Sequence, residues 1–226
     1  DVSNVQVPES EFADDNGLAD PMLRSAILTY TSTGLATDSR HLLSLLVSAR
    51  LLVPVVSFID SQQDGVEKDS HMRSVELHGP NGQKALLAFT GTDSVQMWNA
   101  DARPIPQHAF LVARAAIEQD LDAIILDVAG PTPVALEGTL LNLLAIGPQR
   151  ESLMNAELDR VCLAISDLPS VGSASWSIND ETVVLTLTPR HFDDQFPEQL
   201  SAILNRSQLH ALLDYPFEVT LSGQDS

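Results

Sequence analysis

The chain has 226 residues, of which 44% are hydrophobic, so it can bury a real core as one large domain or two small ones. Twelve Lys and Arg residues against 31 Asp and Glu residues give a formal net charge of -19. A surface of this charge repels phosphate backbones and anionic lipid headgroups, so we expect neither nucleic acid nor a membrane as a partner.

The N-terminal part predicts an acidic tail followed by two helices. Residues 1–16 contain the sequence ESEFADDN and few side chains that could be buried, which is typical of a flexible tail. A short helix is expected over residues 18–31. A stronger helix follows near Thr37, where apolar side chains recur at intervals of three and four: Leu42, Leu45, Leu46 and Ala49.

The next segment predicts a strand, a loop and a hairpin. Residues 51–58 (LLVPVVSF) form an apolar run, in which Pro54 favours an edge strand or a bulge because proline cannot donate to a ladder. The polar residues 60–73 are predicted to be a loop. Two apolar runs then flank Gly79-Pro-Asn-Gly82, which favours a hairpin and therefore antiparallel pairing.

Three further elements are expected before residue 148. A helix follows the proline-flanked Ile105, with Phe110, Ala113 and Ile117 on one face. Residues 123–131 (AIILDVAGP) read as a buried strand that ends at Gly-Pro. A helix with leucines on one side then stops at Gly147-Pro148, and its apolar positions are Leu136, Leu140, Leu143 and Leu144.

From Glu151 the pattern predicts a second unit. A helical stripe ends near Ile165 and leads into a strand of alternating residues at 174–178. The chain turns at 179–181 and returns as a strand at 183–188, in which side chains again alternate. A helix around Leu200 to Leu204 and a closing strand at 216–221 complete the order α-β-β-α-β.

These elements predict an α/β (α+β) fold with a mixed, largely antiparallel sheet flanked by helices and a second, smaller α-β-β-α-β unit. The expected organisation is a flexible acidic tail at 1–16, a first domain at 17–149 and a C-terminal unit at 150–226. Gly147-Pro148 and the change in charge after it mark the boundary.

The order of motifs in the first domain resembles the N-terminal domain of the SseB family. Four motifs carry the resemblance. The first is LLVPVVSF, in which a proline comes two residues before Val-Ser-Phe. The second is GQKALLAFTGTDSVQMW, an apolar strand that ends in Phe-Thr and is followed by a small polar turn and a tryptophan; the third is AIILDVAGP and the fourth is the helix LEGTLLNLLAIG. Relatives end the third motif in Asn-Pro-Gly or similar, whereas this chain has Asp127-Val-Ala-Gly-Pro131. The resemblance covers roughly residues 40–147 and implies a mixed α/β domain of poorly defined function.

The turn after Phe89 is the main candidate for a binding site. Its backbone N-H groups could face an anion, and Asp93 or Ser94 could cap a short following helix. The alternative is structural: Gly91 permits a tight turn, Asp93 caps the helix and Trp98 fills a gap at the sheet edge. Neither a phosphate-loop nor a dinucleotide pattern is present. The candidate binding residues are Phe89, Thr90, Gly91, Thr92, Asp93, Trp98 and Arg103.

No catalytic residue, metal ligand or cofactor is predicted elsewhere. Arg103 could hold an anion or pair with Asp101, and His108 could cap the next helix. The nucleophile elbow Gly-x-Ser-x-Gly is absent, and Cys162 falls on an apolar stripe as expected of an inert core thiol. The best metal cluster would be His191, Asp193 and Asp194, whose carboxylates equally favour a helix start.

We therefore expect a non-catalytic cytoplasmic protein that binds an unknown protein partner, or a second copy of itself as a homo-oligomer. The surface would be an exposed strand edge or a groove near residues 89–98. A single cysteine, no apolar run of membrane-span length and no secretory pattern favour the cytoplasm. The alternative is a small-metabolite sensor or an enzyme whose site gathers distant polar residues: Asp93, Arg103, His108 and Asp127.

Overall fold

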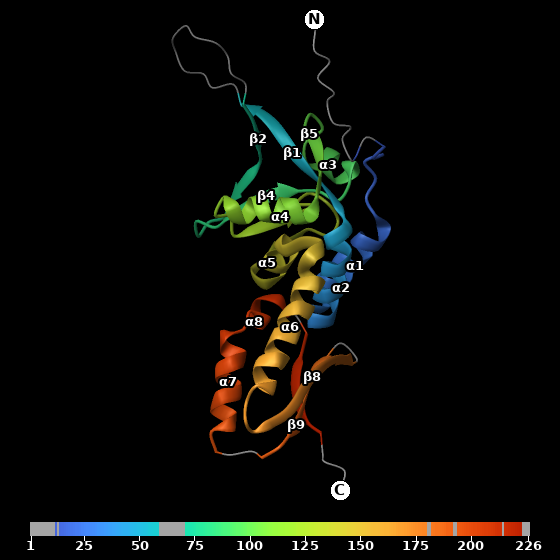
Figure 1. Ribbon diagram of the computed structural model, residues 1–226. Helices are drawn as coiled ribbons and strands as arrows, with labels where there is room; N and C mark the ends of the chain where they lie inside the picture. Colours follow the sequence, from blue (N-terminus) through green and yellow to red (C-terminus); the bar gives the residue numbers. More distant parts are fainter. Residues whose placement is uncertain are drawn as a thin grey trace, which may run out of the picture. The chain divides into compact units, whose positions relative to one another are not determined.

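The structure of the protein, a computed structural model, describes residues 12, 14–58, 71–179, 182–191, 194–213 and 215–222. The chain divides into two compact units, Asp1–Gly147 and Pro148–Ser226. The described part of the first unit holds a four-stranded and a three-stranded sheet, and that of the second holds a three-stranded sheet. The predicted mixed α+β class is therefore confirmed (Figure 1).

The elements of the first unit run in chain order as follows: α1 (Pro21–Thr33), α2 (Ala36–Ser48), β1 (Arg50–Phe58), β2 (His71–Ser74), β3 (Glu76–His78), β4 (Lys84–Ala88), α3 (Thr92–Trp98), β5 (Arg103–His108), α4 (Ala109–Glu118), β6 (Ala123–Leu126), β7 (Val134–Glu137) and α5 (Gly138–Ile146). A 3₁₀ turn at Gly147–Gln149 follows.

Local signals fix the ends of α1. The Asp20 carboxylate accepts a hydrogen bond from the Met22 N-H at 2.8 Å, and Pro21 occupies the first helical position. Gly34 ends the helix in the left-handed conformation, with φ of 63°. This cap and terminator explain why the helix predicted over 18–31 is present but shifted to 21–33.

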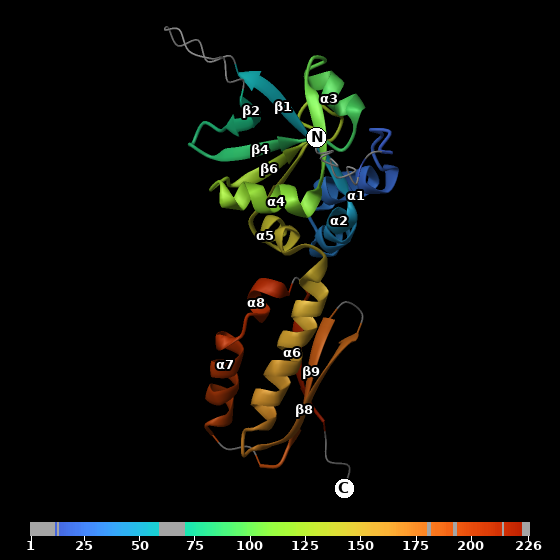
Figure 2. The ribbon, with the colours of Figure 1, turned by 45° about the horizontal axis from the view of Figure 1, so that its top comes forward.

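The main core lies between the four-stranded sheet and the helices. In the order β3-β4-β6-β7, β4 runs parallel to β6 and antiparallel to β3, and β7 is antiparallel to β6. Figure 2 shows α4 and α5 on one side of β4 and β6. Alternate strand residues bury their side chains in the same cluster as these helices: Leu86, Ala88, Ile124, Leu126, Val134 and Leu136. One face of the sheet is thus covered by helices.

Pro54 lies in a central strand, contrary to the expectation of an edge or a bulge. The second sheet has the order β2-β1-β5, and Pro54 pairs with Pro104. The Leu52 N-H donates to the Phe89 carbonyl at 2.8 Å, on the side away from β5. Because backbone groups alternate, Pro54 faces that same side, just before the pairing with β2 begins at Val55. The missing N-H therefore removes no ladder hydrogen bond.

Two strands, β7 and β5, were not predicted from the sequence. Leu136 belongs to β7 and not to the predicted helix, which begins at Gly138; its leucine spacing suits a strand followed by a helix equally well. Residues 103–108 form β5, where Pro104 and Pro106 turn their nitrogens to the outer edge.

Within the predicted loop 60–73, residues 71–73 are strand, and 59–70 lie outside the described residues.

The second unit has the predicted order with one addition. Its elements are α6 (Arg150–Ser166), β8 (Val171–Asn179), β9 (Thr182–Pro189), α7 (Phe196–Arg206), the short α8 (Leu209–Leu212) and β10 (Phe217–Leu221). β9 is central, antiparallel to β8 and parallel to β10. Val183, Leu185 and Leu187 of β9 are fully buried. The predicted alternation thus corresponds to one buried and one partly exposed face of the strand.

The N-terminal segment is described only in part. Most of the predicted tail, residues 1–11 and 13, lies outside the described residues. Asp15, which was assigned to the tail, instead pairs with Arg50.

In the part of the chain that the structure describes, no helix combines the length and the apolar character needed to cross a membrane.

Two glycines with positive φ give a matched test of the first unit. Gly34 has open space around its Cα, whereas a Cβ at Gly147 would lie 2.9 Å from Cδ2 of Phe110. We expect Gly34→Ala to lower the free energy of unfolding by about 1 to 2 kcal/mol through backbone strain alone. Gly147→Ala adds a steric clash and should cost about 3 kcal/mol or more. Urea unfolding measures both, and equal losses would contradict the packing at Phe110.

Candidate functional site

The predicted binding turn joins β4 to α3 and is held by a buried carboxylate. Thr90 is 1% exposed. Its N-H donates to Oδ1 of Asp127 at 2.9 Å, and its hydroxyl donates to Oδ2 at 2.6 Å. Asp127 follows β6 with a φ of 51°, a left-handed conformation that Asp tolerates better than most residues. The turn and the loop after β6 are therefore fixed to each other.

Arg24 of α1 completes this network. Its Nε donates to the Thr90 hydroxyl at 3.0 Å, and its two terminal nitrogens each donate to one Asp93 oxygen at 2.6 Å. Nη2 also donates to the Ser94 hydroxyl at 2.9 Å. Hydrogen bonding to Arg24 holds the pKa of Asp93 below its usual value, against an opposing effect of burial. Asp93 thus acts as an ion-pair partner.

The expected helix cap is absent. Gly91 is the N-cap of α3, and neither Asp93 nor Ser94 caps it through a side chain. Both side chains lie within the helix and point to Arg24, which competes for their oxygens. The assignment of Asp93 or Ser94 as a cap was therefore wrong, because the guanidinium that binds them lies far away in sequence.

The N-terminal stretch of the first unit packs over the same turn. The Thr92 N-H donates to the Gly17 carbonyl at 2.8 Å, and a Cβ on Gly91 would lie 2.7 Å from the Ala19 nitrogen. Arg50 donates to the Thr90 carbonyl at 2.9 Å and pairs with Asp15 at 2.6 Å. The Thr90 and Thr92 donors that could have faced an anion are therefore engaged within the chain.

The four polar residues of the alternative hypothesis are only partly brought together. Asp93 and Asp127 meet around Arg24 and Thr90, beside a cavity of about 360 Å³ that Arg24 and Asp127 also line. Arg103 is exposed on β5 and forms no ion pair with Asp101 among the described residues. The His108 ring lies 4.9 Å from that of Phe12 and 5.3 Å from that of Phe110.

Trp98 belongs to a second, smaller apolar cluster. It is half-buried, and its ring centroid lies 5.5 Å from that of Phe89, which is completely buried. Leu52, Leu87 and Val95 share the cluster. Trp98 therefore fills space beside the four-stranded sheet, on the face opposite the helices.

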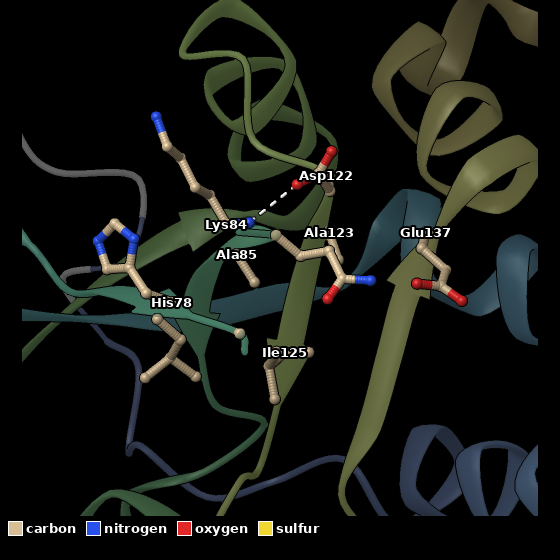
Figure 3. A pocket seen from close by; sticks show the side chains of 10 residues that line it. His78, Lys84, Ala85, Asp122, Ala123, Ile125 and Glu137 are labelled. Atoms are coloured by element: carbon tan, nitrogen blue, oxygen red, sulfur yellow. Dashed lines mark hydrogen bonds between the residues drawn. The ribbon is translucent and has the colours of Figure 1, made fainter. Parts of the chain in front are cut away.

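The same face of the sheet continues into an open groove that the sequence did not reveal. The groove has a volume of about 470 Å³, and Leu77 belongs both to its wall and to the Trp98 cluster. Ala85, Ala123 and Ile125 form its floor, as seen in Figure 3. Ala85 and Ala123 are small, which leaves a hollow at this end of the face, and the alternation along β4 and β6 was the one available signal.

Charged and polar side chains border this floor. They are His78, Gln83, Lys84, Asp122 and Glu137. The Asp122 carboxylate accepts the Lys84 N-H at 2.8 Å, and the Lys84 amine extends away from the floor (Figure 3). Ser, Thr and Cys are absent from the lining residues. The groove thus offers an apolar floor and a rim of mixed charge, which suits binding of an amphipathic segment.

The remaining candidates lie apart from this groove. Cys162 is buried in the second unit, and burial, with a smaller effect of Asp159, raises the pKa of its thiol. Its side chain lies on the predicted apolar stripe of α6. Asp193 of the weighed metal cluster lies outside the described residues, and the described ones contain no group of three or more His, Cys, Asp or Glu suited to a metal ion.

Comparison with known proteins gives one match. The family model described as SseB protein N-terminal domain matches residues 23–142, more than half of the chain. The match begins in α1, earlier than the resemblance suggested, and it includes Arg24 and every candidate residue of the turn. Neither the curated proteins nor the solved structures contain a match to this chain.

The packing of Trp98 against Phe89 predicts a structural cost of truncation. Trp98→Ala should lower the free energy of unfolding by about 2 kcal/mol, because a half-buried aromatic ring is removed. Met97→Ala, at a neighbouring side chain that is 55% exposed, is the control and should have little effect. Chemical denaturation measures both. An unchanged stability of Trp98→Ala would instead identify Trp98 as a free contact residue.

The Asp15 and Arg50 pair predicts a dependence on pH. Burial raises the pKa of Asp15, but hydrogen bonds from Arg50 and the Gly17 N-H, together with the Arg50 charge, outweigh it and bring the pKa below 3.8. The ionised Asp15 side chain therefore stabilises the folded state fully at pH values above the ordinary pKa of an aspartate. This stabilisation is lost as the pH falls through the lowered pKa of Asp15 in the folded chain. Asp15→Asn should therefore cost about 1.5 to 3 kcal/mol at pH 7 and progressively less in acid.

Thermal unfolding of both proteins between pH 7 and pH 2.5 measures this difference. Asp14→Asn, at an exposed neighbouring carboxylate, is the matched control. A deficit of Asp15→Asn that stays constant over the whole range would show that the charge of Asp15 is irrelevant.

Proposed function

Because this chain belongs to the SseB family through its N-terminal domain, we propose that it is a non-catalytic protein-interaction or regulatory module. The observation that carries the proposal is the groove on the face of the four-stranded sheet opposite α4 and α5. Its occupant would be a segment of a protein partner. The proposal includes a cytoplasmic location, which the single cysteine in the sequence favours.

The shape and chemistry of the groove support a binding role. A volume of about 470 Å³ accommodates a few side chains of a partner. Ala85 and Ala123 keep the floor low, so an inserted side chain could approach the strands closely. Lys84 and the carboxylates of Asp122 and Glu137 at the rim offer charges of both signs. Such a rim favours specificity for a partner over tight binding of a single ion.

The turn after β4 is connected to the groove through an apolar cluster. The Phe89 and Trp98 rings pack at a tilt in this cluster, which shares Leu77 with the groove. Thr90, Gly91 and Thr92 are tied to the rest of the unit through their backbones and packing. A turn held in this way needs little ordering when a partner binds. In the proposal, the partner also contacts the exposed side chains of Asp93 and Arg103, which do not line the groove.

A second candidate function rests on the cavity beside Arg24. Arg24, Thr90 and Asp127 come from distant segments and form one network at the cavity wall. Convergence of this kind is what the alternative of a small-metabolite sensor or enzyme requires. A thermal-shift screen with amino acids, nucleotides and divalent cations tests it, since a ligand of the folded chain raises the melting temperature in proportion to its occupancy.

The interaction proposal is tested with a matched pair of variants. Ile125→Thr keeps the branched shape and removes apolar surface from the groove floor. Val128→Thr makes a similar change at a residue that is 38% exposed and does not line the groove. We expect a bound partner to be retained by the wild type and Val128→Thr, and to be weakened about fivefold or more by Ile125→Thr.

Affinity capture from the native host with all three proteins, followed by titration of the recovered partner, gives the measurement. The melting temperatures of both variants are recorded in parallel, so that loss of binding is separated from loss of folding. A partner that binds Ile125→Thr as tightly as the wild type would place the interaction elsewhere on the chain.

A further inference from the structure

Strand β8 of the second unit is a long edge strand without charge. It pairs with β9 on one side only and spans nine residues. The sequence contains no charged residue between Leu168 and Asn179. Edge strands expose unpaired backbone groups, which natural proteins usually protect with charges, prolines or bulges.

Other edge strands of the chain carry such protection. β5 contains two prolines, β10 contains Glu218, and the short β3 and β7 carry Glu76 and Glu137. β8 has one irregularity, between Val171 and Ser173 at its beginning. The rest of this strand lacks these protective features, which indicates an edge that is kept available for pairing.

Hydrogen bonding defines which groups of β8 face outward. The Ala174 N-H donates to the Ser166 hydroxyl of α6 at 3.0 Å, so it points away from β9. Because backbone direction alternates, the N-H and carbonyl groups of Trp176 and Ile178 also face away from β9. Among the described residues no side chain or turn supplies a partner for these groups. They form a free template for one additional strand.

A groove between α6 and β8 adjoins this template. Its volume is about 520 Å³, and its lining includes Leu163, Cys162 and Trp176. Leu163 is 69% exposed and Ile178 is 44% exposed, so both offer apolar surface beside this edge. The Trp176 indole donates to Oδ1 of Asp159 at 2.7 Å, so its ring is held in place. An added strand could insert alternate apolar side chains here.

The charge of the second unit indicates the occupant. Residues 148–226 contain four Arg, no Lys and twelve Asp or Glu, a formal net charge of 4 - 12 = -8. Asp159 lies directly at the groove. Pairing of two β8 strands around Trp176 would bring two Asp159 carboxylates toward each other, which disfavours a second copy. A basic segment is complementary to this surface.

We propose that β8 and the groove beside α6 bind an extended, basic segment of a partner protein by strand addition. The backbone of the segment would pair with Trp176 and Ile178, and its alternate apolar side chains would enter the groove, which is an established mode of peptide recognition. The site lies in the second unit, so it stands whether or not the groove of the first unit binds a partner.

Binding of a fluorescein-labelled peptide of nine alternating lysine and valine residues to the full chain tests the proposal. Two control peptides are used: one with glutamate in place of lysine, and one with N-methyl groups on alternate amides. The N-methylated peptide keeps its side chains but cannot pair as a strand. We expect both controls to bind at least about tenfold more weakly than the parent peptide.

Protein variants test the position of the site. Ile178→Pro removes an outward N-H without removing a bond to β9 and should weaken the parent peptide about fivefold or more. Leu163→Ala should weaken it about threefold or more by reducing the apolar wall. Leu153→Ala is the matched control, because Leu153 is also exposed on α6 but does not line the groove; it should leave binding unchanged. Circular dichroism of each variant verifies that it folds.

Three results would overturn the proposal. The first is equal binding of the acidic or the N-methylated peptide, and the second is equal binding by Ile178→Pro and Leu163→Ala when both are folded. The third is a dimer of the wild-type chain in light scattering that Ile178→Pro converts to a monomer, since a second copy would then occupy the edge. The capture experiment on Ile125→Thr is unaffected by any of these outcomes.

Discussion

The first unit depends on one guanidinium. Arg24 binds Thr90, Asp93 and Ser94 together, and through the Thr90 hydroxyl it reaches the buried carboxylate of Asp127. This links the first helix to the turn after β4, up to 70 residues away in sequence, and through Thr90 to the loop after β6, a further 37 residues along the chain. The planar guanidinium of Arg24 has several N-H donors that point in different directions, so it can bind all of these oxygens at once. The single ammonium group of a lysine could not make the same set of hydrogen bonds.

This network changes how the turn should be understood. The residues that resemble a ligand loop already have partners inside the chain, and the segment at Asp15 and Gly17 packs over them. The surfaces proposed for binding lie on sheets: the groove on the face of β4 and β6 opposite α4 and α5 in the first unit, and the edge of β8 beside α6 in the second. The first has alanine side chains in its floor, and the second has outward-facing backbone groups.

Periodicity predicted most of the elements, because it depends on neighbours along the chain. The stripe of α6, the alternation in β9 and the hairpin at Gly79 to Gly82 all follow from local sequence. The errors arose where distant partners decide the outcome. Pro54 is tolerated centrally because its nitrogen faces away from β5, before pairing with β2 begins at Val55. Leu136 joins a strand because β6 pairs with it, and Asp93 turns to Arg24. The same limit hid both grooves.

The strong acidity acquires a further meaning from the open edge of β8. An uncharged strand with free backbone groups is a place where identical chains can stack into aggregates. A formal net charge of -19 on every copy opposes that approach over distances of about 8 to 10 Å at moderate salt. Mutual repulsion can thus keep the edge unoccupied while a cationic partner still reaches it. Colloidal stability and recognition would then share a single electrostatic origin, one that concentrated salt weakens.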